Sequence, residues 1–333
     1  MPAALLAVAG ATAVIAIVGP RLARVADRLA DRTGLGEAVA GALLLGAATS
    51  LAGIVTTGVG AAEGEGGFAV SNALGGIAVQ TVFISVADLL LRRVNLEHIA
   101  ASLPNILQAT LLLTLLALVL LGVTGPTVEA VGVHPLSLVL VAVYLYGLRV
   151  ARQAHDVPMW RAEETDETVV DRPEEPDDRE SLRGLWSRFA ALAAVLAVAG
   201  WVIGRGGLSI ASESGFTGTE VATLLTGVVT SSPELVVLLA AVRMGSPTLG
   251  IGNIIGGNAF DVMFIPVADV FFRSGSIYQA VDTETVFVLG LTLSMTAVFA
   301  AGLLSRQRKG IGFEGVAILA LYAVGVVALL TGF

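Results

Sequence analysis

Long apolar runs alternate with short polar segments along most of this 333-residue chain. Each run holds roughly 20 residues, enough to cross a hydrocarbon core of about 30 Å as a helix. We expect ten such membrane-spanning runs, near residues 2–20, 36–61, 68–91, 102–123, 131–150, 185–204, 216–242, 248–272, 284–304 and 311–331. The pattern predicts an all-α membrane protein that crosses the lipid bilayer many times.

Composition agrees with this pattern. The chain is 55% hydrophobic and 14% charged, whereas soluble domains contain about 25% charged residues. It has no cysteine, which excludes disulfides, thiolate metal sites and thiol nucleophiles. Because a His-rich metal motif, a nucleophile paired with a base and a phosphate-binding loop are also missing, we do not expect an enzyme.

Basic residues gather at alternate ends of the runs. If the N-terminus lies outside, all but Arg205 and Arg273 of the 19 Lys and Arg residues fall on the cytoplasmic side. The positive-inside rule therefore predicts a multi-pass protein of the cell membrane with both termini outside.

A hydrophilic segment divides the runs into two groups of five. Residues 151–184 include an acidic stretch at 163–180 that is interrupted by Pro173 and Pro176. This composition is typical of a flexible cytoplasmic linker, although it leaves open a calcium-sensing role. We expect two five-helix halves, at residues 1–150 and 185–333.

An internal repeat relates the two halves. Residues 34–92 align without a gap onto residues 215–273 at a constant offset of 181. The matches include Thr49-Ser50 with Thr230-Ser231, Asn72 with Asn253, Gly75-Gly76 with Gly256-Gly257, and Val86-Ala87-Asp88 with Val267-Ala268-Asp269. In the topology above the two copies are inverted, an arrangement typical of secondary transporters, whose sites lie near the midplane between the repeats.

The second copy places two carboxylates deep in apolar runs. The stretch "TSSPELVVLL" (residues 230–239) carries Glu234, and "GNIIGGNAFD" (residues 252–261) carries Asn258 and Asp261. A carboxylate at this depth is costly and usually marks an ion pathway. We expect Glu234 and Asp261 to bind a transported cation or a proton.

Other residues of these stretches are expected to support the site. Pro233 should break its helix and free a backbone carbonyl as an oxygen ligand. Gly252, Gly256 and Gly257 should let the eighth run approach the seventh.

These two stretches together resemble the alpha-repeat signature of the sodium/calcium exchanger superfamily of calcium/cation antiporters. The resemblance implies a ten-helix protein that moves calcium against sodium or protons by alternating access, without a resident cofactor. In the second repeat it implies cation ligands at Thr230, Ser231, Glu234 and Asp261, with Gly257 replacing a small hydroxyl residue.

The first copy departs from that signature in "TSLAGIV" (residues 49–55). Thr49 and Ser50 keep the hydroxyls, but Gly53 stands opposite Glu234, so one family carboxylate is missing. Gln80 stands opposite Asp261, either as a neutral oxygen ligand or as a helix–helix hydrogen-bonding group. With at most two carboxylates, the site should bind divalent ions more weakly.

Several carboxylates fit structural roles. Asp88 and Asp269 each precede an arginine by four residues, Arg92 and Arg273, and we expect both pairs to anchor helix ends. Glu63 falls in an external loop and should be exposed.

The sequence thus favours a sodium/calcium exchanger-like antiporter. It leaves open a monovalent cation/proton antiporter and a transport-inactive membrane scaffold. We expect lipid and small inorganic cations as partners, and no nucleic acid, while the oligomeric state stays open. The expected ion-binding residues are Glu234, Asp261, Thr230, Ser231, Thr49, Ser50 and Gln80, supported by Pro233, Gly75, Gly76, Gly256, Gly257 and Asn258.

Overall fold

The computed structural model describes residues 1–33, 46–91, 95–96, 101–126, 132–156, 181–243, 247–305 and 310–332. Most of the predicted linker, including its acidic stretch, lies outside the described residues. So do the beginning of the first repeat, residues 34–45, and Arg92.

Within the described residues the chain forms helices and no extended strand. Before residues 157–180, the part of the predicted linker that is not described, these are α1 (Pro2–Thr33), α3 (Leu51–Ala62), α4 (Gly66–Leu91), α6 (Leu103–Thr124) and α7 (Pro135–Asp156). After it come α8 (Leu182–Ser214), α9 (Gly218–Val221), the π-helical turn η2 (Ala222–Thr226), α10 (Gly227–Thr230), α11 (Ser232–Arg243), α12 (Pro247–Asp261), α13 (Phe264–Phe271), the 3-10 turn η3 (Ile277–Gln279), α14 (Thr283–Leu304) and α15 (Phe313–Thr331).

The helices confirm the prediction that the chain has many membrane-spanning segments. In the described part of the chain, eight helices are long and apolar enough to cross a membrane, and the bent pair formed by residues 218–230 and 232–242 makes a ninth. The expected span at 36–61 appears as helical residues 46–49 followed by α3, which has 12 residues. Its beginning falls outside the described part.

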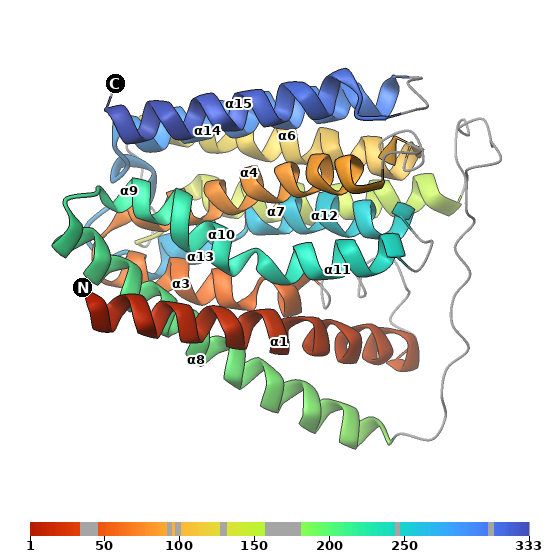
Figure 1. Cartoon of the computed structure of the whole chain (residues 1–333), viewed down its shortest axis with the longest axis horizontal. Coiled ribbons are helices and arrows are strands. Elements are labelled where there is room, and N and C mark those ends of the chain that lie inside the picture. The colour runs from red at the N-terminus through yellow and green to blue at the C-terminus, as the bar shows by residue number, and fades with distance from the viewer. Residues whose placement is uncertain are drawn as a thin grey trace.

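The long helices lie roughly parallel, as Figure 1 shows. Helices α1 and α8 pack together along one edge, α14 and α15 pack together along the opposite edge, and α3, α4 and α10 to α13 lie between them. Large apolar side chains cover the outer helices, including Leu6 (75% exposed), Tyr146 (70%) and Val324 (66%). An outer surface of this kind suits contact with lipid.

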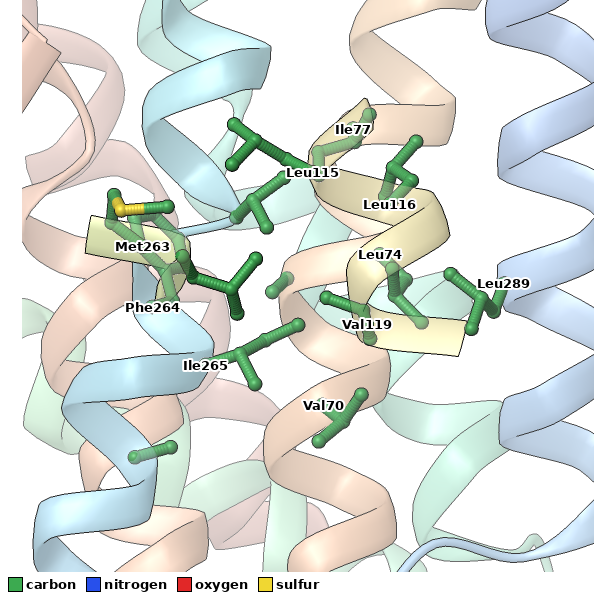
Figure 2. Close-up of a cluster of buried hydrophobic side chains, with 14 of the residues drawn as sticks. Val70, Leu74, Ile77, Leu115, Leu116, Val119, Met263, Phe264, Ile265 and Leu289 are labelled. Carbon is green, nitrogen blue, oxygen red and sulfur yellow. The ribbon is translucent and has the colours of Figure 1, made fainter. Parts of the chain in front are cut away.

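Helix α4 is the most enclosed of the spans, with 83% of its apolar window buried. On one side Leu74 and Ile77 join a cluster with residues of α6, α13 and α14, including Leu115, Ile265 and Leu289 (Figure 2). On the other side its backbone meets η2. A Cβ atom on Gly75 would lie 2.6 Å from the Cα atom of Thr223, so only glycine allows this approach.

Two glycines of α12 face a different helix from the one that we expected. Cβ atoms added at Gly252 and Gly256 would lie 3.5 Å from Asn105 Oδ1 and 3.2 Å from Gln108 Oε1, both on α6. It is Gly250 that faces α11, where an added Cβ would lie 3.0 Å from Leu238. The prediction that Gly252 and Gly256 bring the eighth run to the seventh was therefore wrong.

Candidate cation-binding site

Both repeats interrupt a span at the same position. Ser50 lies between helical residues 46–49 and α3 with φ −86° and ψ 3°, and Ser231 lies between α10 and α11 with φ −89° and ψ 3°. In the second copy the two segments are bent by 42°. The second copy breaks beside Pro233, as expected, whereas the first copy breaks with Ala52 at the equivalent position, so a proline is not required for the break.

A sequence pattern that both copies share offers a cause for the break that has no proline. The chain reads Gly-Ala-Ala-Thr-Ser at residues 46–50 and Gly-Val-Val-Thr-Ser at residues 227–231. In each copy the threonine hydroxyl donates to the glycine carbonyl three residues earlier, over 3.2 Å for Thr49 and 3.4 Å for Thr230. Hydroxyls that bond to the backbone compete with the helical hydrogen bonds and bend helices.

The next span is interrupted in the second copy only. Residues Val262 and Met263 form a turn between α12 and α13, whereas α4 is continuous. Pro266 stands where the first copy has Ser85, and a proline lacks the N–H that would continue the helix across the turn. Asp261 is thereby placed at a helix end, while Gln80 stays inside a helix.

Asp261 is held by donors from the first copy. It is 2% exposed. Ser50 Oγ donates to its Oδ1 over 2.5 Å, and Gln80 Nε2 donates to its Oδ2 over 2.6 Å. The first repeat therefore supplies hydrogen-bond donors to the carboxylate of the second.

Glu234 occupies the first turn of α11, where the helix N-terminus stabilises negative charge. It is 1% exposed and lies beside the side chain of Thr49. Its Oε2 atom has no hydrogen-bonding partner.

Glu234 and Asp261 line one buried pocket between the copies. Its lining residues come from both repeats: Ser50, Gly53, Asn72, Gly76, Gln80, Thr230, Ser231, Glu234, Asp261 and Phe264. Two oxygens of this lining, Gln80 Oε1 and Glu234 Oε2, receive no hydrogen bond. Buried acceptors are normally satisfied, and a cation with oxygen ligands would satisfy these two.

The structure brings most of the predicted site residues together. The pocket is lined by the predicted residues Thr230, Ser231, Glu234, Asp261, Ser50, Gln80 and Gly76. Thr49 is not part of the lining but lies beside Glu234. Gly257 lies against Gln80, with 3.6 Å between an added Cβ and Oε1. Asn258 donates to Thr81 Oγ1 over 3.4 Å and is not part of the lining. Gly75 packs on η2 and Gly256 on α6, outside the pocket.

Besides Gly53, two lining residues were not predicted as site residues, although both recur in the repeat. Asn72 donates to Thr57 Oγ1 over 2.9 Å and accepts from Thr226 Oγ1 over 2.7 Å, so it ties α4 to α3 and η2. The Phe264 ring packs directly against Gly53. The sequence signals that could have identified these two residues were the repeat matches of Asn72 with Asn253 and of Phe83 with Phe264.

The remaining carboxylates have structural partners. Asp269 accepts from the backbone N–H of His134 over 2.8 Å and from Ser137 Oγ over 2.7 Å, while Arg273 is exposed. The prediction that Asp269 pairs with Arg273 was wrong. Asp88 accepts from the N–H of Leu96 over 2.8 Å.

The loop carboxylate Glu63 is exposed, as expected, and forms an ion pair with Arg205.

The fold and the pocket define a helical membrane protein with a buried two-carboxylate site between two copies of a repeat. The family model described as "Sodium/calcium exchanger protein" matches residues 3–151 and 184–331, most of the chain. The chain therefore belongs to the sodium/calcium exchanger family, as the sequence resemblance implied.

Individual relatives are more distant. The chain is 27% identical over 116 residues to "Sodium/calcium exchanger MaX1" of Methanosarcina acetivorans, a match that covers 34% of this chain and only about a third (32%) of that relative.

Solved structures share the fold over nearly the full chain. Native YfkE superimposes with a TM-score of 0.63 at 14% identity, covering 98% of this chain and 92% of that one. The sodium-calcium exchanger NCX_Mj gives 0.60 at 19%, covering 97% and 99%. The H⁺/Ca²⁺ exchanger CAX gives 0.63 at 15%, covering 99% and 82%.

Proposed function

We propose that this chain is a secondary active cation antiporter that binds its ion between Glu234 and Asp261, near the middle of the membrane. The observation that carries the proposal is the buried pocket itself. It contains two carboxylates and two unpartnered oxygens, and its described lining contains no Lys, Arg or His. Without a cation or a proton, two carboxylates buried this way would be severely destabilising.

The architecture we propose has ten spans in two inverted halves, 1–150 and 185–333, joined by the cytoplasmic linker 151–184, with both termini outside the cell membrane. The equivalent breaks at Ser50 and Ser231 support the inverted repeat. The two segments matched by the family model, 3–151 and 184–331, support the division into halves.

Alternating access would come from movement of α1 and α8. The two helices pack together, and each contacts the broken span of the other half. A Cβ atom on Gly19 of α1 would lie 2.7 Å from Pro233 Cγ, next to Glu234. On α8, the carbonyl of Gly200 accepts from Thr56 Oγ1 over 2.9 Å, one turn from Gly53. Sliding of this pair would uncover the pocket on one side at a time.

Family membership favours calcium and sodium as the exchanged ions. Exchange of monovalent cations and protons is the second candidate, favoured by one observation: Gly53 contributes no carboxylate to the lining. A transport-inactive scaffold of the same fold would have no reason to keep Glu234 and Asp261 buried in one pocket.

Flux measurements test the proposal. The purified chain is reconstituted in proteoliposomes, sodium or pH gradients are imposed, and calcium, sodium and proton fluxes are followed. We expect gradient-driven cation flux that is lost in Glu234→Gln and in Asp261→Asn. The control Glu65→Gln removes an exposed carboxylate outside the pocket and should transport normally. Absence of gradient-driven flux for every cation, in a folded and correctly inserted protein, would refute the proposal.

A further inference from the structure

Phe264 fills the place that a side chain at position 53 would take. A Cβ atom on Gly53 would lie 2.6 Å from Cε2 and 3.0 Å from Cζ of the Phe264 ring. Phe264 is 4% exposed and packs edge-to-face on Phe260, with ring centroids 6.4 Å apart. Figure 2 shows Phe264 and Met263 beside the cluster formed with α4 and α6. The ring is therefore enclosed, and a carboxylate at position 53 has no room while Phe264 is present.

Asp261 already accepts from two donors of the first copy, which leaves about one lone pair on each oxygen for an ion. Both of its oxygens accept hydrogen bonds, from Ser50 and from Gln80. The orientation of the Gln80 amide follows from chemistry, because a carboxylate accepts and only the amide nitrogen donates. The same nitrogen also donates to Ser231 Oγ over 3.2 Å. The Gln80 amide nitrogen thus occupies the space between Asp261 and Ser231 in which a cation could otherwise contact both side chains.

The unpartnered oxygens in the lining are then one carboxylate oxygen, Glu234 Oε2, and one neutral carbonyl, Gln80 Oε1. Calcium takes about six to eight oxygen ligands, and its affinity falls when fewer of those ligands are charged. A sodium ion carries half the charge, and a proton needs a single oxygen.

We infer that this pocket binds one monovalent cation at a time, sodium in competition with protons, and rejects calcium, and that the contact between Gly53 and Phe264 determines this specificity. The inference rests on the proposed function, since it assigns the ion class of the same site, and it selects the second candidate, exchange of monovalent cations and protons, over calcium–sodium exchange.

Direct binding tests it without requiring transport. Radioactive sodium binding is measured on the purified full chain in detergent, and the bound sodium is displaced with calcium chloride or by lowering the pH. For the wild type we expect saturable sodium binding that protons displace and calcium does not, at matched ionic strength. If calcium displaces sodium from the wild type as effectively as protons do, the inference is overturned. This measurement needs only the wild-type protein.

Two double variants test the role of the contact. Gly53→Glu with Phe264→Ala gives the carboxylate both room and charge, and Gly53→Gln with Phe264→Ala is the matched neutral control. Because calcium affinity follows ligand charge, we expect calcium to displace sodium at a concentration about tenfold or more lower in the Glu variant than in the Gln variant. Equal displacement in two monodisperse variants would refute the assignment of specificity to this contact.

Flux and sodium-binding measurements together distinguish a failure of this inference from a failure of the proposed function. Sodium-driven calcium flux in wild-type proteoliposomes would overturn monovalent specificity and leave cation antiport standing. Absence of saturable sodium binding, together with absence of gradient-driven flux of any cation, would instead remove the proposed function.

Discussion

Ser50 donates a hydrogen bond to Asp261, and the residues at the equivalent repeat positions, Ser231 and Gln80, are also hydrogen-bonded to each other. The first bond spans 2.5 Å and the second 3.2 Å. In one pair a hydroxyl donates to a carboxylate, and in the other a hydroxyl accepts from an amide. The two copies thus preserve the position of the contact while its chemistry has changed, which leaves all the negative charge of the pocket in the second copy.

Removal of the Ser50 hydroxyl should destabilise the protein. Ser50→Ala leaves Oδ1 of a buried carboxylate without its donor, which costs about 1–3 kcal/mol in the free energy of unfolding. Ser50→Thr keeps a donor and should recover most of the loss. Ser231→Ala is the repeat-matched control and should cost less, because its bond is longer and lies between neutral groups. Unfolding in detergent micelles measures the series, and equal losses for the two alanine variants would contradict this account.

The backbone contact between α4 and η2 predicts a strong effect at Gly75. Its added Cβ would lie 2.6 Å from the Cα atom of Thr223, and backbone yields less readily than the end of a side chain. We expect Gly75→Ala to lower stability by about 1–3 kcal/mol through overpacking.

Gly290 provides the control for this substitution, because nothing lies within 4 Å of an added Cβ there. Gly290→Ala in α14 should be neutral or stabilising by up to about 1 kcal/mol, since alanine favours helix more than glycine does. The two variants are compared by thermal unfolding in the same detergent. A Gly75→Ala protein as stable as the Gly290→Ala protein would show that α4 and η2 are less tightly fitted than the structure indicates.

The Gly53–Phe264 contact predicts energetic coupling. Gly53→Ala should destabilise the wild type by about 1–3 kcal/mol because its methyl group meets the phenyl ring. In a Phe264→Ala background the same substitution should cost nothing or stabilise. A double-mutant cycle measures the interaction free energy directly, and a value within about 0.5 kcal/mol of zero, the usual limit for independent sites, would contradict the steric argument.

The spans and the position of the pocket could be predicted from sequence because both follow from strong local rules. A membrane span needs about 20 apolar residues, and a carboxylate inside one stands out. Glu234 and Asp261 were found in this way. The repeat then located Ser50 and Gln80 by register alone.

Other features depended on contacts between distant segments. Phe264 resembles an ordinary apolar residue of a span, and its role arises only because the other repeat brings Gly53 to its ring. Gly252 and Gly256 were assigned to the wrong neighbour, because a glycine permits close approach without specifying the partner. The break at Ser50 has no proline to mark it, and the recurring glycine and threonine at residues 46 and 49 were the local signal for its cause.

Asp269 should act as a structural residue, in contrast to Asp261. It accepts from the N–H of His134 and from Ser137 Oγ, and hydrogen bonds to a charged group contribute about 1.5–3 kcal/mol each. Asp269→Ala should therefore destabilise strongly, and Asp269→Asn, which keeps an accepting oxygen, should do so less. Neither variant should change ion preference in the sodium-binding measurement. A change of preference in a folded Asp269→Asn protein would contradict a purely structural role.

Tyr278 extends this network and predicts an alkaline loss of stability. Its hydroxyl lies 2.9 Å from Ser137 Oγ, and because Ser137 donates to Asp269, Tyr278 must donate to Ser137. Burial, together with nearby Asp269, raises the pKa of Tyr278, so the folded state favours the neutral phenol. Stability from this group is fully present below the unfolded tyrosine pKa of about 10 and is lost as the pH rises toward the folded pKa.

Tyr278→Phe should therefore be less stable than the wild type at neutral pH, and the difference should shrink as the pH rises above about 10. Unfolding of both proteins in detergent between about pH 7 and about pH 11 measures the effect, with exposed Tyr146 changed to Phe as the control. The difference in stability between that control and the wild type should not change with pH, because Tyr146 is exposed and lies outside the network of Asp269, Ser137 and Tyr278. A difference between Tyr278→Phe and the wild type that stays constant across this range would show that Tyr278 does not donate its proton to Ser137.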